Sequence, residues 1–111
     1  MNSSDRLRAL LDDLPPAPRR VVLSEADERI MRSLRTQGER AVRGRLVTRY
    51  RFEAVERPRG ISLVMRIEGR HAMSVAQQLA KRFGMAEDIG NAEVTRTERG
   101  AVLELRPRET R

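Results

Sequence analysis

A chain of 111 residues is long enough to bury one modest core and too short for two domains. It has no cysteine and no Trp, which excludes disulfides and thiolate metal sites and leaves the core to Leu, Val, Ile, Met and Ala. Its formal net charge of +7, from 23 basic and 16 acidic residues, favours an anionic partner.

The cellular setting follows from what the composition lacks. No apolar stretch approaches the ~20 residues of a membrane span, and no basic segment leads into an apolar one near the N-terminus. Together with the absence of cysteine, this leads us to expect a soluble cytoplasmic protein with no membrane partner.

The first expected element is a short amphipathic helix within a separate N-terminal region, residues 1–20. Ser4-Asp5 is a suitable cap, and Pro15-Pro16-Ala17-Pro18 ends the helix and forms a stiff spacer. A helix this short is marginal alone, so its leucine face should dock on this domain, on a second copy or on another protein. The face consists of Leu7, Leu10, Leu11 and Leu14.

Two longer amphipathic helices are expected further along the chain. Ser24 begins a run resembling a capping box, and apolar residues at helical spacing predict a helix from 25 to about 42, with Gly38 as a possible break. The second helix follows His71 and ends at Gly84. Its apolar face should comprise Ala72, Val75, Ala76, Leu79, Ala80 and Phe83.

A β-hairpin is expected after each of these helices. Residues 45–70 alternate between apolar and polar about Arg57-Pro58-Arg59-Gly60, and a weaker hairpin turns at Glu98-Arg99-Gly100. The order helix, hairpin, helix, hairpin predicts an α+β fold, a two-layer sandwich of a four-stranded antiparallel sheet with helices on one face. This single domain should cover residues 21–106, followed by a polar tail at 107–111.

That element order resembles one half of the LAGLIDADG-type endonuclease fold, a group with nuclease-dead relatives among bacterial regulators. The resemblance lies in the order of elements only. Those nucleases place an acidic residue at the end of their first helix, and residues 39–44 here read Glu-Arg-Ala-Val-Arg-Gly without an Asp. The resemblance therefore does not assign the chain to that family.

The register of the first hairpin follows from its apolar faces. Bringing those faces together pairs Glu56 with Ile61, which places Phe52 opposite Met65. The same register sets Arg51 opposite Arg66 and Arg49 opposite Glu68. A three-residue turn with a bulge at Gly60 would put Phe52 against Arg66, and we reject it because of burial. The expected core is Leu46, Tyr50, Phe52, Leu63, Met65, Ile67, Val75, Leu79, Phe83, Leu103 and Leu105.

Positive charge concentrates around this hairpin. Residues 43–71 contain eight Arg against three Glu, a net +5, whereas segments 1–20, 21–42, 72–90 and 91–111 are each neutral or +1. The leading hypothesis is therefore a non-catalytic nucleic-acid-binding protein, for DNA or RNA, that grips phosphates through the hairpin. Its contacts would be Arg45, Arg49, Arg51 and Arg66 on the open sheet face and Arg57 and Arg59 on the turn.

Other hypotheses remain open at this stage. The basic face could be merely solvated, or the protein could be an adaptor or inhibitor that binds an acidic protein through the hairpin or the leucine helix. Homodimerisation through a sheet edge or face is a further expectation. Tyr50 and Phe52 share the apolar face, which favours core packing over base stacking.

No enzyme chemistry is indicated by the sequence. His71 is the only histidine, and its place between strand and helix suits a capping or solvent-facing role. The carboxylate clusters lie where helix ends and loops carry acids anyway, and no nucleophile adjoins a base. We therefore expect no catalytic residue, no metal and no cofactor.

Overall fold

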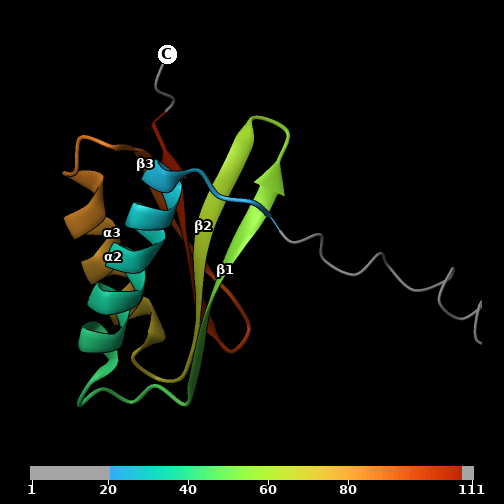
Figure 1. The fold of residues 1–111 in the computed structure, drawn as a ribbon. Coiled ribbons are helices and arrows are strands. Elements are labelled where there is room, and N and C mark those ends of the chain that lie inside the picture. Colours follow the sequence, from blue (N-terminus) through green and yellow to red (C-terminus); the bar gives the residue numbers. More distant parts are fainter. Residues whose placement is uncertain (1–20, 109–111) are drawn as a thin grey trace, which may run out of the picture.

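A computed structural model of the chain describes residues 21–108, which form two helices and one four-stranded antiparallel sheet (Figure 1). The α+β class and the antiparallel sheet are confirmed. The expected N-terminal helix, over residues that include Leu7 to Leu14, lies outside the described residues. The elements are α2 (Glu25–Val42), β1 (Arg49–Arg57), β2 (Gly60–Glu68), α3 (Ala72–Gly84), β3 (Ile89–Arg96) and β4 (Gly100–Pro107).

The sheet has the strand order β1-β2-β4-β3, so the two hairpins lie side by side and β1 and β3 form the edges. Both helices lie on the same side of the sheet (Figure 1). Their apolar faces and one face of the sheet bury a single core, while no described helix covers the other face, which we call the open face. The core includes Ile30, Met31, Leu34, Leu63, Met65, Ile67, Val75, Leu79, Phe83, Leu103 and Leu105.

The first hairpin has the register derived from burial. Glu56 pairs with Ile61 and Phe52 with Met65, and the last pair, Arg57 with Gly60, leaves a two-residue turn. The alternative bulged turn would have moved the alternation by one residue, and the structure does not adopt it. Burial of one face thus decided between two turns that the local sequence allows.

Gly38 does not break α2 but lets it approach the sheet. The helix is continuous from Glu25 to Val42, and Ser24 caps it by accepting a hydrogen bond from the Asp27 backbone N–H at 3.2 Å. A Cβ built on Gly38 would lie 2.9 Å from Met65 Sδ and from the Phe52 ring. The possible break at Gly38 is not formed, and the absence of a side chain there lets α2 pack closely against Met65 and Phe52.

Two residues expected in the core are exposed. Leu46 is 55% exposed and Tyr50 is 39% exposed, whereas Phe52 is half-buried and packs against the core. Leu46 precedes β1, which begins at Arg49 rather than at Arg45, so it lies beyond the sheet. Tyr50 is near the start of an edge strand, and its ring lies 5.9 Å from the Phe52 ring between centroids, in an edge-to-face pair.

Candidate nucleic-acid interface

Three connections meet at the end of the molecule where α2 finishes. They are the α2–β1 loop (43–48), the β2–α3 loop (69–71) and the β3–β4 turn (97–99), seen at the lower end in Figure 1. The Leu46 backbone N–H donates to His71 Nδ1 at 2.9 Å, and the His71 N–H donates to the Leu46 carbonyl at 3.1 Å. The Gly69 N–H donates to the Arg99 carbonyl at 3.0 Å. The three segments are therefore bound directly to one another.

Two glycines make this close approach possible. Gly69 has φ +130°, and a Cβ there would lie 2.5 Å from the Leu46 carbonyl oxygen. A Cβ on Gly100 would lie 2.1 Å from the Ile67 carbonyl oxygen. A side chain at Gly69 would push the β2–α3 loop away from the α2–β1 loop, and one at Gly100 would push the start of β4 away from the end of β2.

Most of the chain's net positive charge lies at this end. Residues 39–51, 66–71 and 96–99 contain nine Arg and three Glu, which is +6 of the total of +7. We call these three segments the basic end. Its arginines are Arg40, Arg43, Arg45, Arg49, Arg51, Arg66, Arg70, Arg96 and Arg99, all exposed.

Only two of the nine arginines form an ion pair with another described residue. Arg66 Nε lies 2.5 Å from Glu53 Oε1, and Arg49 Nε lies 4.0 Å from Glu68 Oε2. The other seven have no carboxylate within 4 Å among residues 21–108. Within the described part of the chain, no carboxylate neutralises these seven guanidinium groups.

Arg45 lies at the basic end but not on the open sheet face. Its guanidinium donates to Ser74 Oγ at 3.1 Å and to Gln78 Oε1 at 3.3 Å, both on α3. The predicted orientation was wrong because Arg45 belongs to the loop before β1, where strand alternation does not apply. It extends the basic end toward the helix side.

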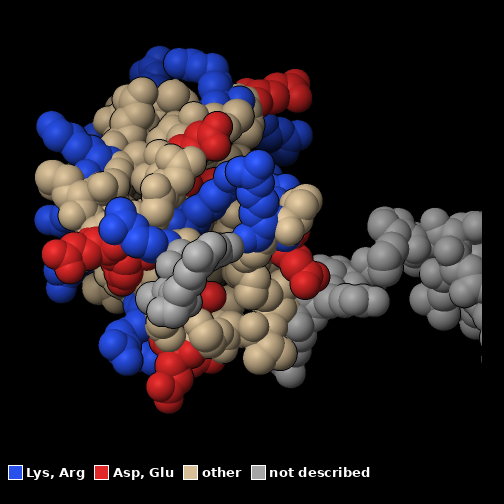
Figure 2. Space-filling model, turned by 90° about the horizontal axis from the view of Figure 1, so that it is seen from above, with Lys and Arg blue, Asp and Glu red and all other residues tan. Residues whose placement is uncertain are grey.

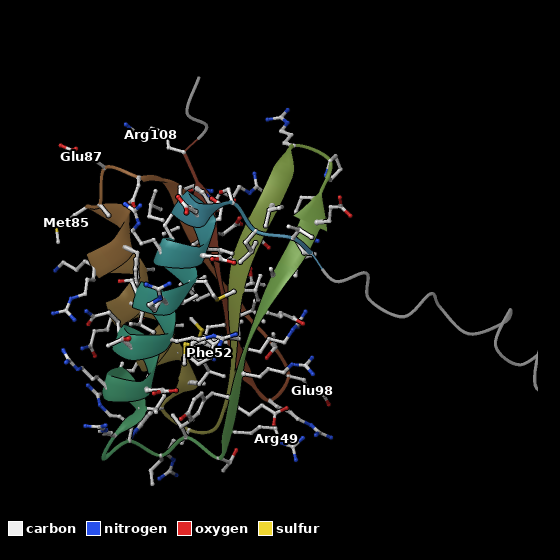
Figure 3. The ribbon with its side chains drawn as sticks, in the orientation of Figure 1. Arg49, Phe52, Met85, Glu87, Glu98 and Arg108 are labelled. Atoms are coloured by element: carbon white, nitrogen blue, oxygen red, sulfur yellow. The ribbon has the colours of Figure 1, made fainter. Side chains whose placement is uncertain are left out.

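A shallow hollow of about 400 Å³ opens on the sheet side of the basic end. Arg51 and Arg66 are cross-strand neighbours beside it, and Arg99 reaches it from the β3–β4 turn. Figure 3 shows Arg49 and Glu98 near each other at this end of the molecule. Four arginines and two glutamates line the hollow, namely Arg49, Arg51, Arg66 and Arg99 with Glu68 and Glu98.

The open face does not continue this positive surface toward the hairpin tip. One cross-strand row in the middle of the sheet brings Glu53, Glu104 and Glu93 together with Val64. This acidic row separates Arg51 and Arg66 from the arginines near the tip. A charge sum along the sequence could not show it, because two of the three glutamates come from the second hairpin.

Arg57 and Arg59 lie at the opposite end, which we call the hairpin-tip end. Arg57 Nη2 lies 2.8 Å from Glu104 Oε1, so its charge is partly compensated by a carboxylate that it shares with Arg106. Burial alone would raise the pKa of Glu104, but hydrogen bonds from Arg57 and Ser62 and the positive charge of Arg57 bring that pKa below 4.5. Seen from above this end, acidic and basic side chains are interspersed (Figure 2).

The structure thus divides the six predicted contact residues. Arg45, Arg49, Arg51 and Arg66 lie at the basic end, and Arg57 and Arg59 lie at the hairpin-tip end. The sequence interpretation missed five further arginines of the basic end. Antiparallel pairing of the two hairpins would have found those on the turn, because the start of β4 then lies beside the end of β2. The five are Arg40, Arg43, Arg70, Arg96 and Arg99.

Comparison with protein-family models, with curated proteins and with solved structures found no match for the chain. Within residues 21–108, no group of three or more His, Cys, Asp or Glu side chains is arranged to hold a metal ion. Neither described helix combines the length and apolar character needed to cross a bilayer. The arrangement of charge is therefore the feature from which a function can be argued.

Proposed function

We propose that the protein binds nucleic acid, DNA or RNA, without catalysis and through phosphate contacts at the basic end. The observation that carries the proposal is the net charge of +6 on the basic end, whose three connections are hydrogen-bonded to one another and where seven exposed arginines have no carboxylate partner among residues 21–108. Guanidinium groups bind phosphate oxygens through paired N–H donors. All nine basic residues of the basic end are Arg.

An extended polyanion fits this surface better than a small anion. The free arginines are spread from the last turn of α2 to the β3–β4 turn rather than gathered around one deep cavity. A chain of phosphates can contact several of them at once, and each contact releases a counterion. Phosphate contacts position a protein without reading bases, so we expect weak sequence preference.

The test compares two fourfold Arg→Gln variants that remove equal charge. The first changes Arg43, Arg51, Arg70 and Arg99 at the basic end. The control changes Arg29, Arg32, Arg59 and Arg108, which are exposed arginines outside the basic end. Binding of duplex DNA, single strands and RNA is measured against salt concentration. The basic-end variant should flatten the slope of log affinity against log salt by about 3 to 4 for duplex DNA, and the control by less than about 1.

Two results would contradict the proposal. If both variants weaken binding equally, the net charge alone attracts nucleic acid and the basic end has no special role. If the parent protein binds no nucleic acid at low salt, the anionic partner is of another kind. An acidic protein surface, bound through the same arginines, would then be the better explanation.

A further inference from the structure

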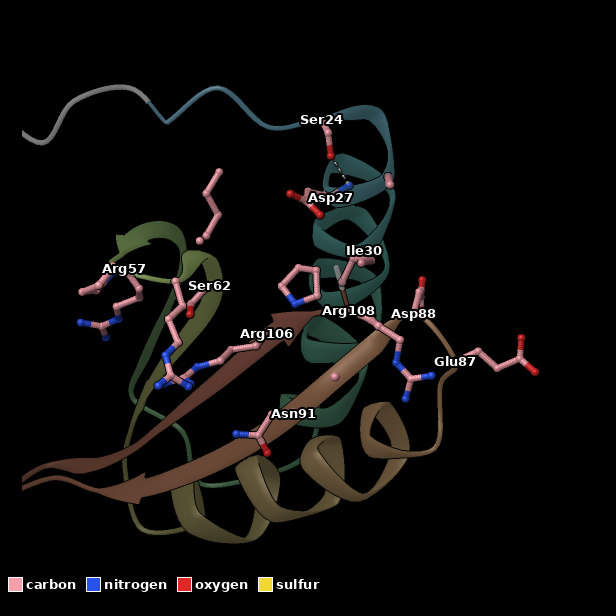
Figure 4. Close-up of a pocket in the computed structure, with 17 residues that line it drawn as sticks. Ser24, Asp27, Ile30, Arg57, Ser62, Glu87, Asp88, Asn91, Arg106 and Arg108 are labelled. Atoms are coloured by element: carbon pink, nitrogen blue, oxygen red, sulfur yellow. Dashed lines mark hydrogen bonds between the residues drawn. The ribbon is translucent and has the colours of Figure 1, made fainter. Parts of the chain in front are cut away.

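An open cleft of about 1060 Å³ lies at the hairpin-tip end, between the start of α2 and the β1–β2 turn (Figure 4). It is bounded on one side by Ser24 and Asp27 and on the other by Arg57 and Ser62. The exposed lining is mostly apolar. Its apolar part comes from Ala26, Ile30, Pro58, Ile61 and Pro107.

The cleft forms because the first hairpin extends beyond the end of the β2–β4 ladder. β2 pairs with β4 only from Leu63 to Glu68, so the hairpin beyond Leu63 has no ladder partner on that side. The core side of this projection faces the first turn of α2, and Ile61 there is only half-buried. An apolar segment that filled the cleft would bury Ile61 and complete the core at this end.

We propose that residues 7–14 of the same chain dock in this cleft through their leucine face. The length of the intervening chain permits it. Ser24 and Ala26 line the cleft, and the described chain begins only three residues before Ser24. The six residues 15–20 span at most about 20 Å when extended. This length lets Leu14 lie at the cleft, and it disfavours docking of the leucine face at the basic end.

Net charge is compatible with the same occupant. Four basic and three acidic residues line the cleft, a net +1, namely Arg57, Arg59, Arg106 and Arg108 with Asp27, Glu87 and Asp88. Residues 5–14 contain two Arg and three Asp, a net −1, so the segment and the cleft are opposite in net charge.

This docking is independent of nucleic-acid binding, because the basic end lies at the opposite end of the molecule. Loss of either property would leave the other measurable.

The test uses the absence of cysteine from the chain. Leu11→Cys is combined with Ile61→Cys in the full chain, and disulfide formation under mild oxidation is followed by mass. The control combines Leu11→Cys with Met85→Cys, because Met85 is 78% exposed and lies outside the cleft. We expect an intramolecular disulfide at least tenfold faster than in the control, at a rate unchanged by about a hundredfold dilution.

Further variants decide what the crosslink means. In the Leu11→Cys and Ile61→Cys background, changing Leu7, Leu10 and Leu14 to Ser should lower the rate to that of the control. Disulfide-linked dimers whose yield rises with concentration would overturn the proposal in favour of a second copy. A rate equal to the control would overturn it outright. If Ile61→Cys unfolds the domain, Pro58→Cys, an exposed position in the same cleft, replaces it.

Discussion

Arg57 of β1 and Glu104 of β4 form an ion pair across the intervening strand, with 2.8 Å between Nη2 and Oε1. On β2, Ser62 donates to the other Glu104 oxygen at 3.0 Å. The β2–β4 ladder ends at Leu63, so these bonds hold the projecting part of the first hairpin to β4 beyond the ladder. The Glu104 side chain is 15% exposed, which makes its interactions stronger than those of a surface pair.

Glu104→Gln should destabilise the fold by about 1–3 kcal/mol, because the amide keeps the shape but loses the charge that Arg57 and Arg106 face. Urea denaturation measures the change. Glu93→Gln is the matched control, since Glu93 lies in the same cross-strand row but is exposed and unpaired among residues 21–108. Equal effects of the two substitutions would show that the pairing contributes nothing.

The stability that Glu104 provides should depend on pH in one direction. Its pKa is lowered from 4.5 because hydrogen bonds from Arg57 and Ser62 outweigh the opposing effect of burial. A lowered folded-state pKa means that the stabilisation is complete above about 4.5 and is lost as pH falls through the folded value. The difference in denaturation midpoint between the parent and Glu104→Gln should therefore shrink below pH 4.5. A constant difference down to the acid limit would contradict this assignment.

Gly38→Val should destabilise the protein by about 1–3 kcal/mol although valine is the better helix former. The new side chain would enter the contact between α2 and the pair Met65 and Phe52, where even a Cβ is 2.9 Å from its neighbours. Ser33→Val, on the exposed face of the same helix, separates propensity from packing. A gain in thermal stability for Gly38→Val would mean that the sheet side chains move aside at little cost.

The sequence predicted the strand register correctly where alternating apolar residues had to lie on one buried face. Alternation in β1 and β2 required Phe52 to oppose Met65, and it rejected the bulged turn at Gly60. It failed at Leu46 and Tyr50 because apolar character says nothing about whether a strand has begun or whether a helix still covers it. Leu46 lies in the loop before β1, and Tyr50 lies near the start of an edge strand.

The candidate site was less predictable than the fold for a related reason. The charge of residues 43–71 was visible in the sequence, but its division between the two ends of the molecule was not. Glu104 neutralises Arg57 from 47 positions away, and Arg99 joins the basic end through a hydrogen bond to Gly69. Both relationships come from strand pairing between the two hairpins.

His71→Ala should weaken nucleic-acid binding without changing its salt dependence, if the basic end is the interface. The imidazole Nδ1 accepts from the Leu46 N–H and so holds the loop that carries Arg43 and Arg45. Without it, the loop must be ordered on binding, and the affinity should fall by about three- to tenfold while the number of phosphate contacts, and hence the slope, stays the same. Amide exchange at Leu46 should become faster in the same variant. A flattened slope would mean instead that the imidazole itself contacts a phosphate, and unchanged affinity despite faster exchange would place Arg43 and Arg45 outside the interface.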